Sequence, residues 1–227
     1  MLLQFNLKIY FTFLFALLVF VSTGFSQGTS YLDSLDGKFA LQFQINENFR
    51  LSNFQGSTLS GKYHFSTRDA IRLGLSISFS DSDGEVSSNA LDTINVITNT
   101  IDNSSYGITV NTQYIRYIKG TDDISFFVGG GPFIVYSTST SNREIREKQP
   151  VEKYKSTRDS YTFGIDLLLG VEWWFHKYMS LSAEYGMKFM YSSRETINEL
   201  GVVRRKLSEN FFRITANSIN FGITVYF

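Results

Sequence analysis

The chain has 227 residues, no cysteine and a formal net charge of zero, because 21 basic residues balance 21 acidic ones. The absence of cysteine excludes a disulfide framework, a thiolate metal site and a lipid-modified N-terminal cysteine. The balanced charge provides no overall positive field, so we expect no nucleic-acid partner.

The N-terminal segment predicts a cleaved signal peptide. Lys8 precedes an uncharged run over residues 9–21, which is too short for a membrane helix of about 20 residues. Small residues follow, with Gly24 and Ser26 placed for a signal peptidase. We therefore expect cleavage after Ser26, the alternative being an uncleaved anchor helix. Residues 27–36 then form a short periplasmic segment, and residues 37–227 form one domain.

The remainder alternates apolar and polar residues with a period of two and shows no sustained helical pattern. Eight segments carry this alternation and predict an all-β fold. They lie near residues 39–46, 59–66, 71–80, 106–118, 124–136, 161–176, 179–191 and 219–227.

Two segments are less regular than the others. The alternation is confused where Ile115 and Tyr117 follow Tyr114, so we expect a bulge near Thr112–Ile115. Pro132 ends a run of three glycines, Gly129–Gly131, and cannot donate to a ladder paired on both sides. We expect a bulge or the barrel rim there. The glycines do not read as a phosphate-binding loop, because no Lys-Ser/Thr pair and no helix pattern follow.

The connections alternate in length. Short ones at residues 67–69, 119–123 and 176–177 alternate with long polar ones at residues 47–57, 81–105, 137–160 and 193–209. Short periplasmic turns and long external loops are typical of outer-membrane barrels. Eight such segments therefore predict an eight-stranded antiparallel up-and-down transmembrane β-barrel, in the outer membrane of a bacterium with two membranes, with both termini in the periplasm.

A soluble barrel such as a lipocalin shows the same alternation, but with a charged face toward water. Here the polar face consists mainly of Ser, Gly, Gln, Asn and Thr, which suits a narrow lumen better than a soluble surface. Aromatic residues also gather at the two ends of the segments, as interfacial girdles do in a bilayer. The predicted girdles contain Phe65, Tyr114, Phe126, Trp173, Phe175 and Tyr178 near the short turns, and Tyr106, Tyr136, Tyr161, Phe189, Tyr191 and Phe211 near the long loops.

The last segment places Phe221, Ile223 and Val225 at alternate positions before a terminal Phe227. This pattern resembles the assembly signal of outer-membrane β-barrel proteins. The whole domain is similar in topology to the small eight-stranded family of OmpA-type barrel domains and OmpX-like proteins. The resemblance implies periplasmic chaperones and the barrel-assembly machinery as partners, and contact with outer-membrane lipid and lipopolysaccharide.

An eight-stranded barrel has an interior that side chains can fill, so we expect no wide pore. Charged residues on the polar face must pair to offset desolvation, either as static ion pairs or along a gated, narrow ion path. The candidates for this network are Lys62, His64, Arg72, Asp166, Glu172, Glu184 and Lys188.

Eight-stranded outer-membrane barrels also include lipid-modifying enzymes, and His64, Ser66 and Glu184 are the candidates for a catalytic triad. His64 lies beside the first short turn, away from outer-leaflet substrate, so we expect no catalysis and no cofactor. His176 has no second histidine in metal-ligand register, so we expect no metal site.

The long loops carry the remaining candidates. Arg204, Arg205 and Lys206 form a basic run that could contact lipopolysaccharide phosphates, or simply be solvated. We expect a non-catalytic barrel for envelope integrity or for surface interaction through its external loops. A narrow ion channel is the second alternative and an outer-leaflet lipid-modifying enzyme the third. The sequence identifies no ligand.

Overall fold

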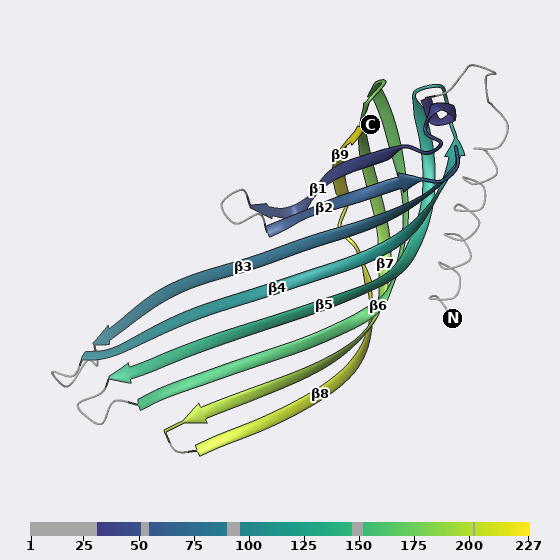
Figure 1. The fold of residues 1–227 in the computed structure, drawn as a ribbon. Coiled ribbons are helices and arrows are strands. Elements are labelled where there is room, and N and C mark those ends of the chain that lie inside the picture. Colours follow the sequence, from purple (N-terminus) through teal and green to yellow (C-terminus); the bar gives the residue numbers. More distant parts are fainter. Residues whose placement is uncertain (1–30, 51–54, 90–95, 147–151, 202) are drawn as a thin grey trace, which may run out of the picture.

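The computed structural model describes residues 31–50, 55–89, 96–146, 152–201 and 203–227, which are almost entirely antiparallel strands (Figure 1). The predicted signal peptide and its cleavage position lie outside these residues. No helix in the described part of the chain is long and apolar enough to cross a membrane. The elements are η1 (Tyr31–Ser34), β1 (Phe39–Arg50), β2 (Gln55–His64), β3 (Asp69–Asn89), β4 (Val96–Lys119), β5 (Ile124–Arg146), β6 (Glu152–His176), β7 (Met179–Leu200), β8 (Val203–Ala216) and β9 (Asn220–Tyr226).

The sheet closes into a ring. Neighbouring strands pair in chain order from β1 to β7, and β9 lies between β7 and β1. Strands β8 and β9 both pair with β7, one beyond the other, and together they occupy the eighth position of the ring. The predicted eight-stranded antiparallel β-barrel is confirmed.

A bulge separates β8 from β9. Met187 of β7 pairs with Ala216, and Glu184 pairs with Asn220. Two residues of β7 (185 and 186) therefore lie opposite three (217–219) of the eighth strand. Because one extra residue reverses which side chains face outward, the prediction that Phe211 belongs to the outer girdle is wrong. Phe212 faces outward instead and is 66% exposed.

The bulge predicted near Thr112–Ile115 in β4 is wrong. β4 pairs with β3 in one register from Asp69↔Arg116 to Asn89↔Val96. Ile115 and Tyr117 keep the alternation and point into the barrel, where both are buried. The alternation of apolar and polar residues is lost in the sequence because the inside of the barrel is apolar at the end with the short turns and polar farther along.

The bulge or rim predicted at Gly129–Pro132 is also wrong. Strand β5 continues through this run to Arg146, and its register with β6 does not shift. With β4, the pairs on either side of Gly131 and Pro132 keep one register, but these two residues pair with none. A Cβ on Gly131 would clash with the carbonyl oxygen of Thr112. The glycine thus permits a close approach of β4 and β5 where the proline interrupts their ladder.

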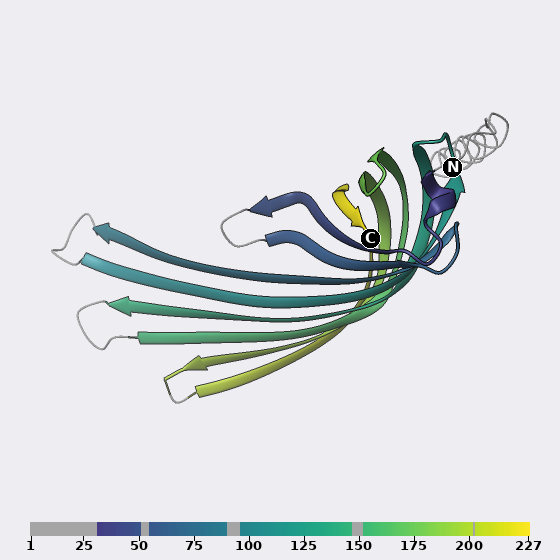
Figure 2. The same cartoon turned by 45° about the horizontal axis from the view of Figure 1, so that its top comes forward.

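The predicted long loops are mainly strand. Residues 81–89 and 96–105 continue β3 and β4, and β5 to β8 are prolonged in the same way. These strands run past the β1–β2 hairpin as a curved sheet (Figures 1 and 2). We call the part beyond the outer aromatic row the sheet extension. It comprises residues 81–89, 96–105, 138–146, 152–160, 192–200 and 203–211.

The sheet extension has two unpaired edges. Among the described residues, β3 pairs with β2 only up to Leu59↔Leu75, and β9 pairs with β1 only up to Ile45↔Phe221. Beyond these points β3 pairs only with β4, and β8 pairs only with β7. The ring is therefore closed at the end with the short turns and open on one side at the other end.

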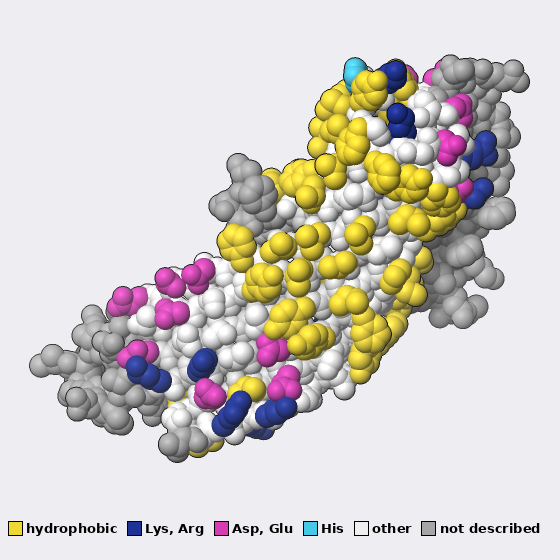
Figure 3. All heavy atoms as spheres, in the orientation of Figure 1, with side chains coloured by type: hydrophobic (Ala, Val, Ile, Leu, Met, Phe, Trp, Pro, Cys, Tyr) yellow, Lys and Arg dark blue, Asp and Glu magenta, His cyan; other side chains and the backbone are white. Residues whose placement is uncertain are grey.

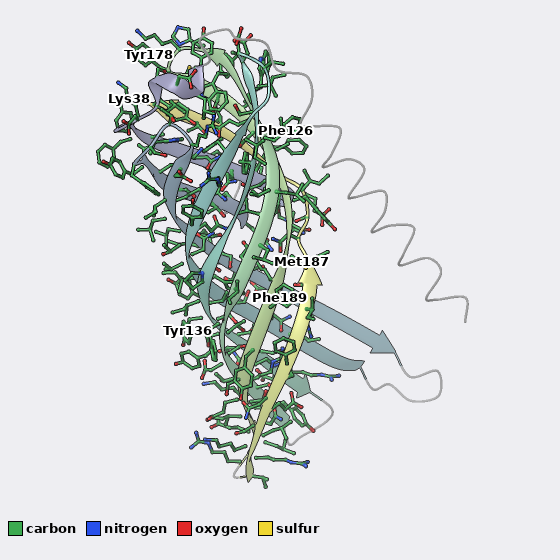
Figure 4. All side chains as sticks on the ribbon, turned by 90° about the vertical axis from the view of Figure 1, so that its right-hand side faces the viewer. Lys38, Phe126, Tyr136, Tyr178, Met187 and Phe189 are labelled. Carbon is green, nitrogen blue, oxygen red and sulfur yellow. The ribbon has the colours of Figure 1, made fainter. Side chains whose placement is uncertain are left out.

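The outside of the barrel is apolar. Exposed Leu, Ile, Val and Phe side chains form a band around the middle of the molecule, and charged side chains lie at both ends of the face shown (Figure 3). Aromatic rings border the band near the extension, where the ring centroids of Tyr136 and Tyr161 lie 4.9 Å apart. Figure 4 shows Phe126 and Tyr178 toward the end with the turns and Tyr136 farther along the barrel.

Candidate functional site

An apolar plug closes the inside of the barrel at the end with the short turns. The element η1 folds across this end and buries Leu32 and Leu35. The backbone N–H of Tyr31 donates to the carbonyl of Asp122 in the β4–β5 turn, which attaches the segment to the barrel. The plug consists of Leu32, Leu35, Ala40, Ala70, Ile115, Tyr117, Phe127, Leu168, Trp174 and Tyr226.

The first ion pair lies directly against this plug. Lys62 of β2 approaches Glu172 of β6 across the barrel, with Nζ 3.1 Å from Oε2. The hydroxyls of Tyr117, Ser180 and Tyr226 also donate to the Glu172 carboxylate. Lys62 and Glu172 are 2% and 0% exposed, so the carboxylate is completely desolvated and fully hydrogen-bonded.

The second ion pair lies one layer farther from the turns. Arg72 of β3 binds both carboxylate oxygens of Glu184 of β7, at 2.9 and 3.2 Å. Its remaining donors reach Gln113 of β4 and Gln42 of β1. Both partners are buried. A planar guanidinium is suited to this position because it can bind several acceptors at fixed angles.

Asp166 and Lys188 complete the polar layer toward the sheet extension. Asp166 accepts hydrogen bonds from Gln113 at 2.9 Å and from Asn217, in the bulge, at 3.0 Å. Lys188 is the register partner of Asp166, and its Nζ lies 5.3 Å from the centroid of the Phe133 ring. A continuous polar network therefore links β1, β3, β4, β6, β7 and the bulge, next to the Lys62 pair.

His64 lies between the plug and the ion pairs, but it joins no ion pair among the described residues. Its ring stacks on Tyr117 with centroids 5.3 Å apart, and neither imidazole nitrogen has a hydrogen-bond partner in the described part of the chain. Ser66 instead donates to Asp69 in the first turn, and Glu184 is held by Arg72. The three candidates for a catalytic triad are therefore not assembled.

Sequence reasoning missed the neutral residues that complete the network. Gln42, Gln113, Tyr117 and Tyr226 bind the charged groups, but nothing in an alternating pattern separates them from other inward residues. The plug formed by η1 was also missed. Its signal was the apolar pair Leu32 and Leu35, spaced as on one helical turn.

The sheet extension has an inner face that continues the lumen surface and an outer face that continues the apolar band. Successive side chains alternate between these faces. Arg204 and Lys206 lie on the outer face, 3.6 Å from Glu199 and 2.8 Å from Glu195 respectively. Arg205 points to the inner face. The predicted basic run thus lies on strand β8 rather than in a loop, and it is divided between two surfaces.

The predicted assembly residues lie on β9 and at the C-terminus. Phe221, Ile223, Val225 and Phe227 all face outward and are exposed, as members of the apolar band. The described residues contain no group of three or more His, Cys, Asp or Glu side chains that could hold a metal ion.

No protein-family model matches the chain, and neither does any curated protein. Among solved structures, it is similar to CarO of Acinetobacter baumannii, with 9% identity and a TM-score of 0.40 over 86% of this chain and 99% of that one. It is similar to Ail, the attachment invasion locus protein of Yersinia pestis, with 12% identity and a TM-score of 0.37 over 85% and 99%. A major outer membrane protein from Thermus thermophilus has 12% identity and a TM-score of 0.41 over 84% and 98%.

Proposed function

We propose that this chain is an outer-membrane β-barrel with a closed lumen, which holds a polar β-sheet outside the cell for surface interaction. The apolar band supports the membrane location, because a ring of exposed Leu, Ile, Val and Phe side chains is stable only in lipid. Where the ring is closed, up to Leu75 of β3 and Phe221 of β9, each strand is paired on both sides, as a hydrocarbon environment requires.

The sheet extension is the observation that carries the proposed role. Six strands continue beyond the apolar band as a hydrogen-bonded sheet, and their outer face changes there from apolar to charged. A barrel that only spanned the membrane would not need strands of this length. Rigid strands that project from a membrane anchor are a suitable support for recognition.

The direction of insertion follows from connection length. We propose that the signal peptide over residues 1–26 directs export, and that the short turns and η1 face the periplasm. Periplasmic chaperones and the barrel-assembly machinery would then insert the chain, recognising Phe221, Ile223, Val225 and Phe227. The sheet extension would lie on the outside, where lipopolysaccharide surrounds the barrel.

The closed lumen argues against the channel alternative. The Lys62–Glu172 and Arg72–Glu184 pairs span the interior, and the apolar plug lies beneath them. An ion would have to separate desolvated pairs in order to pass. The role proposed here is non-catalytic, since His64, Ser66 and Glu184 do not meet.

The test combines conductance with surface labelling. The refolded protein in a planar bilayer should show no steady conductance, because the apolar plug and the two buried ion pairs close the lumen. In whole cells, a single cysteine at Ser141 in the sheet extension should react with a membrane-impermeant maleimide. A cysteine at Arg68 in the first turn should stay unlabelled. Steady conductance of the unaltered protein, or the reverse labelling pattern, would contradict the proposal.

A further inference from the structure

Charge is divided between the two faces of the sheet extension. Among the described side chains, the outer face carries charges of both signs, with more acids than bases. The acids are Asp81, Asp83, Glu85, Asp102, Glu144, Asp159, Glu195 and Glu199, and the bases are Lys153, Lys155, Arg204 and Lys206. On the inner face, the described charged side chains are Arg143, Arg158, Arg194, Arg205 and Glu209. Four arginines therefore face the same side with one acid.

The inner arginines differ in their surroundings. Arg194 lies 3.9 Å from Glu209 and packs on the Phe211 ring at 5.0 Å, so part of its charge is used within the sheet. Arg143, Arg158 and Arg205 are exposed. Inside the barrel, Arg72 finds an acid on the strand that faces it. In the extension no facing strand exists among the described residues, because β1, β2 and β9 end below it.

Small polar side chains lie beside the arginines on the inner face. Ser139 of β5 is the register partner of Arg158, and Asn198 of β7 is the register partner of Arg205. The other small polar residues of the inner face include Ser82, Asn103, Ser105, Ser141, Ser156 and Thr196. Apolar and aromatic side chains share this face, namely Ile101, Tyr154, Leu200, Val203, Leu207 and Phe211. The hydroxyl and amide groups among them supply both donors and acceptors, which is the chemistry needed to bind sugar hydroxyls.

A groove lies on this face near the end of the strands. Its volume is about 640 Å³, and it is lined both by polar side chains, including Arg143, Ser156, Asn198 and Arg205, and by Tyr154, Leu200 and Val203. At the bottom of the groove, between Arg143 and Arg205, the hydroxyl of Ser156 donates to Asn198 at 2.7 Å. The groove is open to solvent along the sheet, so it can accept a segment of a long chain.

We propose that the inner face of the sheet extension binds an anionic polysaccharide that reaches the cell from outside. Guanidinium groups bind sulfate and carboxylate oxygens through paired hydrogen bonds, and the polar surface between them binds the sugar hydroxyls. Lipopolysaccharide of the same membrane is the less suitable occupant, since it surrounds the outer face, where acids predominate. This inference rests on the proposed function, because it requires the sheet extension to lie outside the cell.

The experiment measures binding of fluorescent dextran sulfate to the full protein in phosphatidylcholine nanodiscs at about 0.15 M salt, where charges separated by more than about 8 Å are largely screened. The Arg143→Gln/Arg158→Gln/Arg205→Gln variant should bind about 100-fold more weakly, as loss of charge-assisted hydrogen bonds predicts. The matched control is Lys153→Gln/Arg204→Gln/Lys206→Gln, which removes the same charge from the outer face. It should change the affinity less than about 3-fold. Heat-modifiable gel mobility verifies that each variant is folded.

Several outcomes would overturn the inference. Equal loss of affinity in both variants would indicate attraction by total charge rather than a site on the inner face. Equal binding of neutral dextran, or no binding of dextran sulfate, would also contradict it. If the three arginines affect binding only when the nanodisc contains lipopolysaccharide, the ligand of the inner face is lipopolysaccharide and the proposed external polysaccharide is wrong. Maleimide labelling at Ser141 decides independently whether the sheet extension is external, so failure of this inference is distinguishable from failure of the proposed function.

Discussion

The barrel and the sheet extension are built from the same strands, yet their inner faces differ. In the barrel, Arg72 and Lys62 meet Glu184 and Glu172 across the lumen. In the extension, Arg158 and Arg205 project from strands with no wall in front of them among the described residues. The comparison shows that alternation, together with the bulge between β8 and β9, decides which face a charged residue occupies. Closure of the ring decides whether that residue becomes part of the interior or remains available to a partner.

The largest effect is expected where closure has buried a charge. Glu172→Ala leaves Lys62 desolvated without its carboxylate, which should lower the free energy of unfolding by about 3–5 kcal/mol. Urea unfolding of the refolded protein in vesicles measures this change. The double variant Lys62→Met/Glu172→Leu removes both charges and should recover most of the stability. A single variant as stable as the unaltered protein would show that the pair is solvated.

The geometry of the second pair can be tested with charge held constant. Arg72→Lys keeps one positive charge but cannot reach Glu184, Gln113 and Gln42 together. We expect a loss of about 1.5–3 kcal/mol, as for hydrogen bonds to charged groups. The same substitution at exposed Arg158 is the control and should leave the unfolding free energy unchanged. If Arg72→Lys and Arg158→Lys lowered the unfolding free energy equally, burial in the barrel would not distinguish Arg72 from an arginine of the sheet extension.

Close strand contact in the barrel wall predicts a smaller effect. Gly131→Ala places a Cβ against the Thr112 carbonyl oxygen and should cost about 1–3 kcal/mol. Gly61→Ala is the matched control, because an added Cβ there meets nothing within 4 Å. Unfolding in urea, followed by tryptophan fluorescence, compares the two variants. If Gly131→Ala is as well tolerated as Gly61→Ala, the glycine run is not required by the approach of β4 to β5.

The smallest effect is expected on the outer face of the sheet extension. Lys206 pairs with Glu195 at 2.8 Å, but its side chain is 60% exposed. Lys206→Gln should change the unfolding free energy by less than about 1 kcal/mol, and less still at high salt. Lys62→Gln is the comparison in the barrel, where a change several times larger is expected. A large effect of Lys206→Gln would mean that the extension depends on its ion pairs.

The eight segments and their outward side chains could be predicted from the sequence, because a period of two is a local property of the strand. The same pattern also assigned Lys62, Arg72, Glu172 and Glu184 to the interior. It could not assign the direction of Phe211, because a single extra residue between β8 and β9 reverses the alternation and leaves no clear local signal. Ile115 and Tyr117 were misread for another reason. An apolar layer inside the barrel resembles a break in the pattern.

What the amino-acid sequence determined by itself is the alternation, the number of strands, the apolar outer band and the set of charges that point inward. Only the tertiary structure decided which of those charges meet, how far the strands extend and that η1 closes one end. The physical reason is that partners such as Lys62 and Glu172 are 110 residues apart along the chain, and only closure of the ring places them together. The same closure ends below the sheet extension, and there no strand among the described residues faces Arg158 and Arg205.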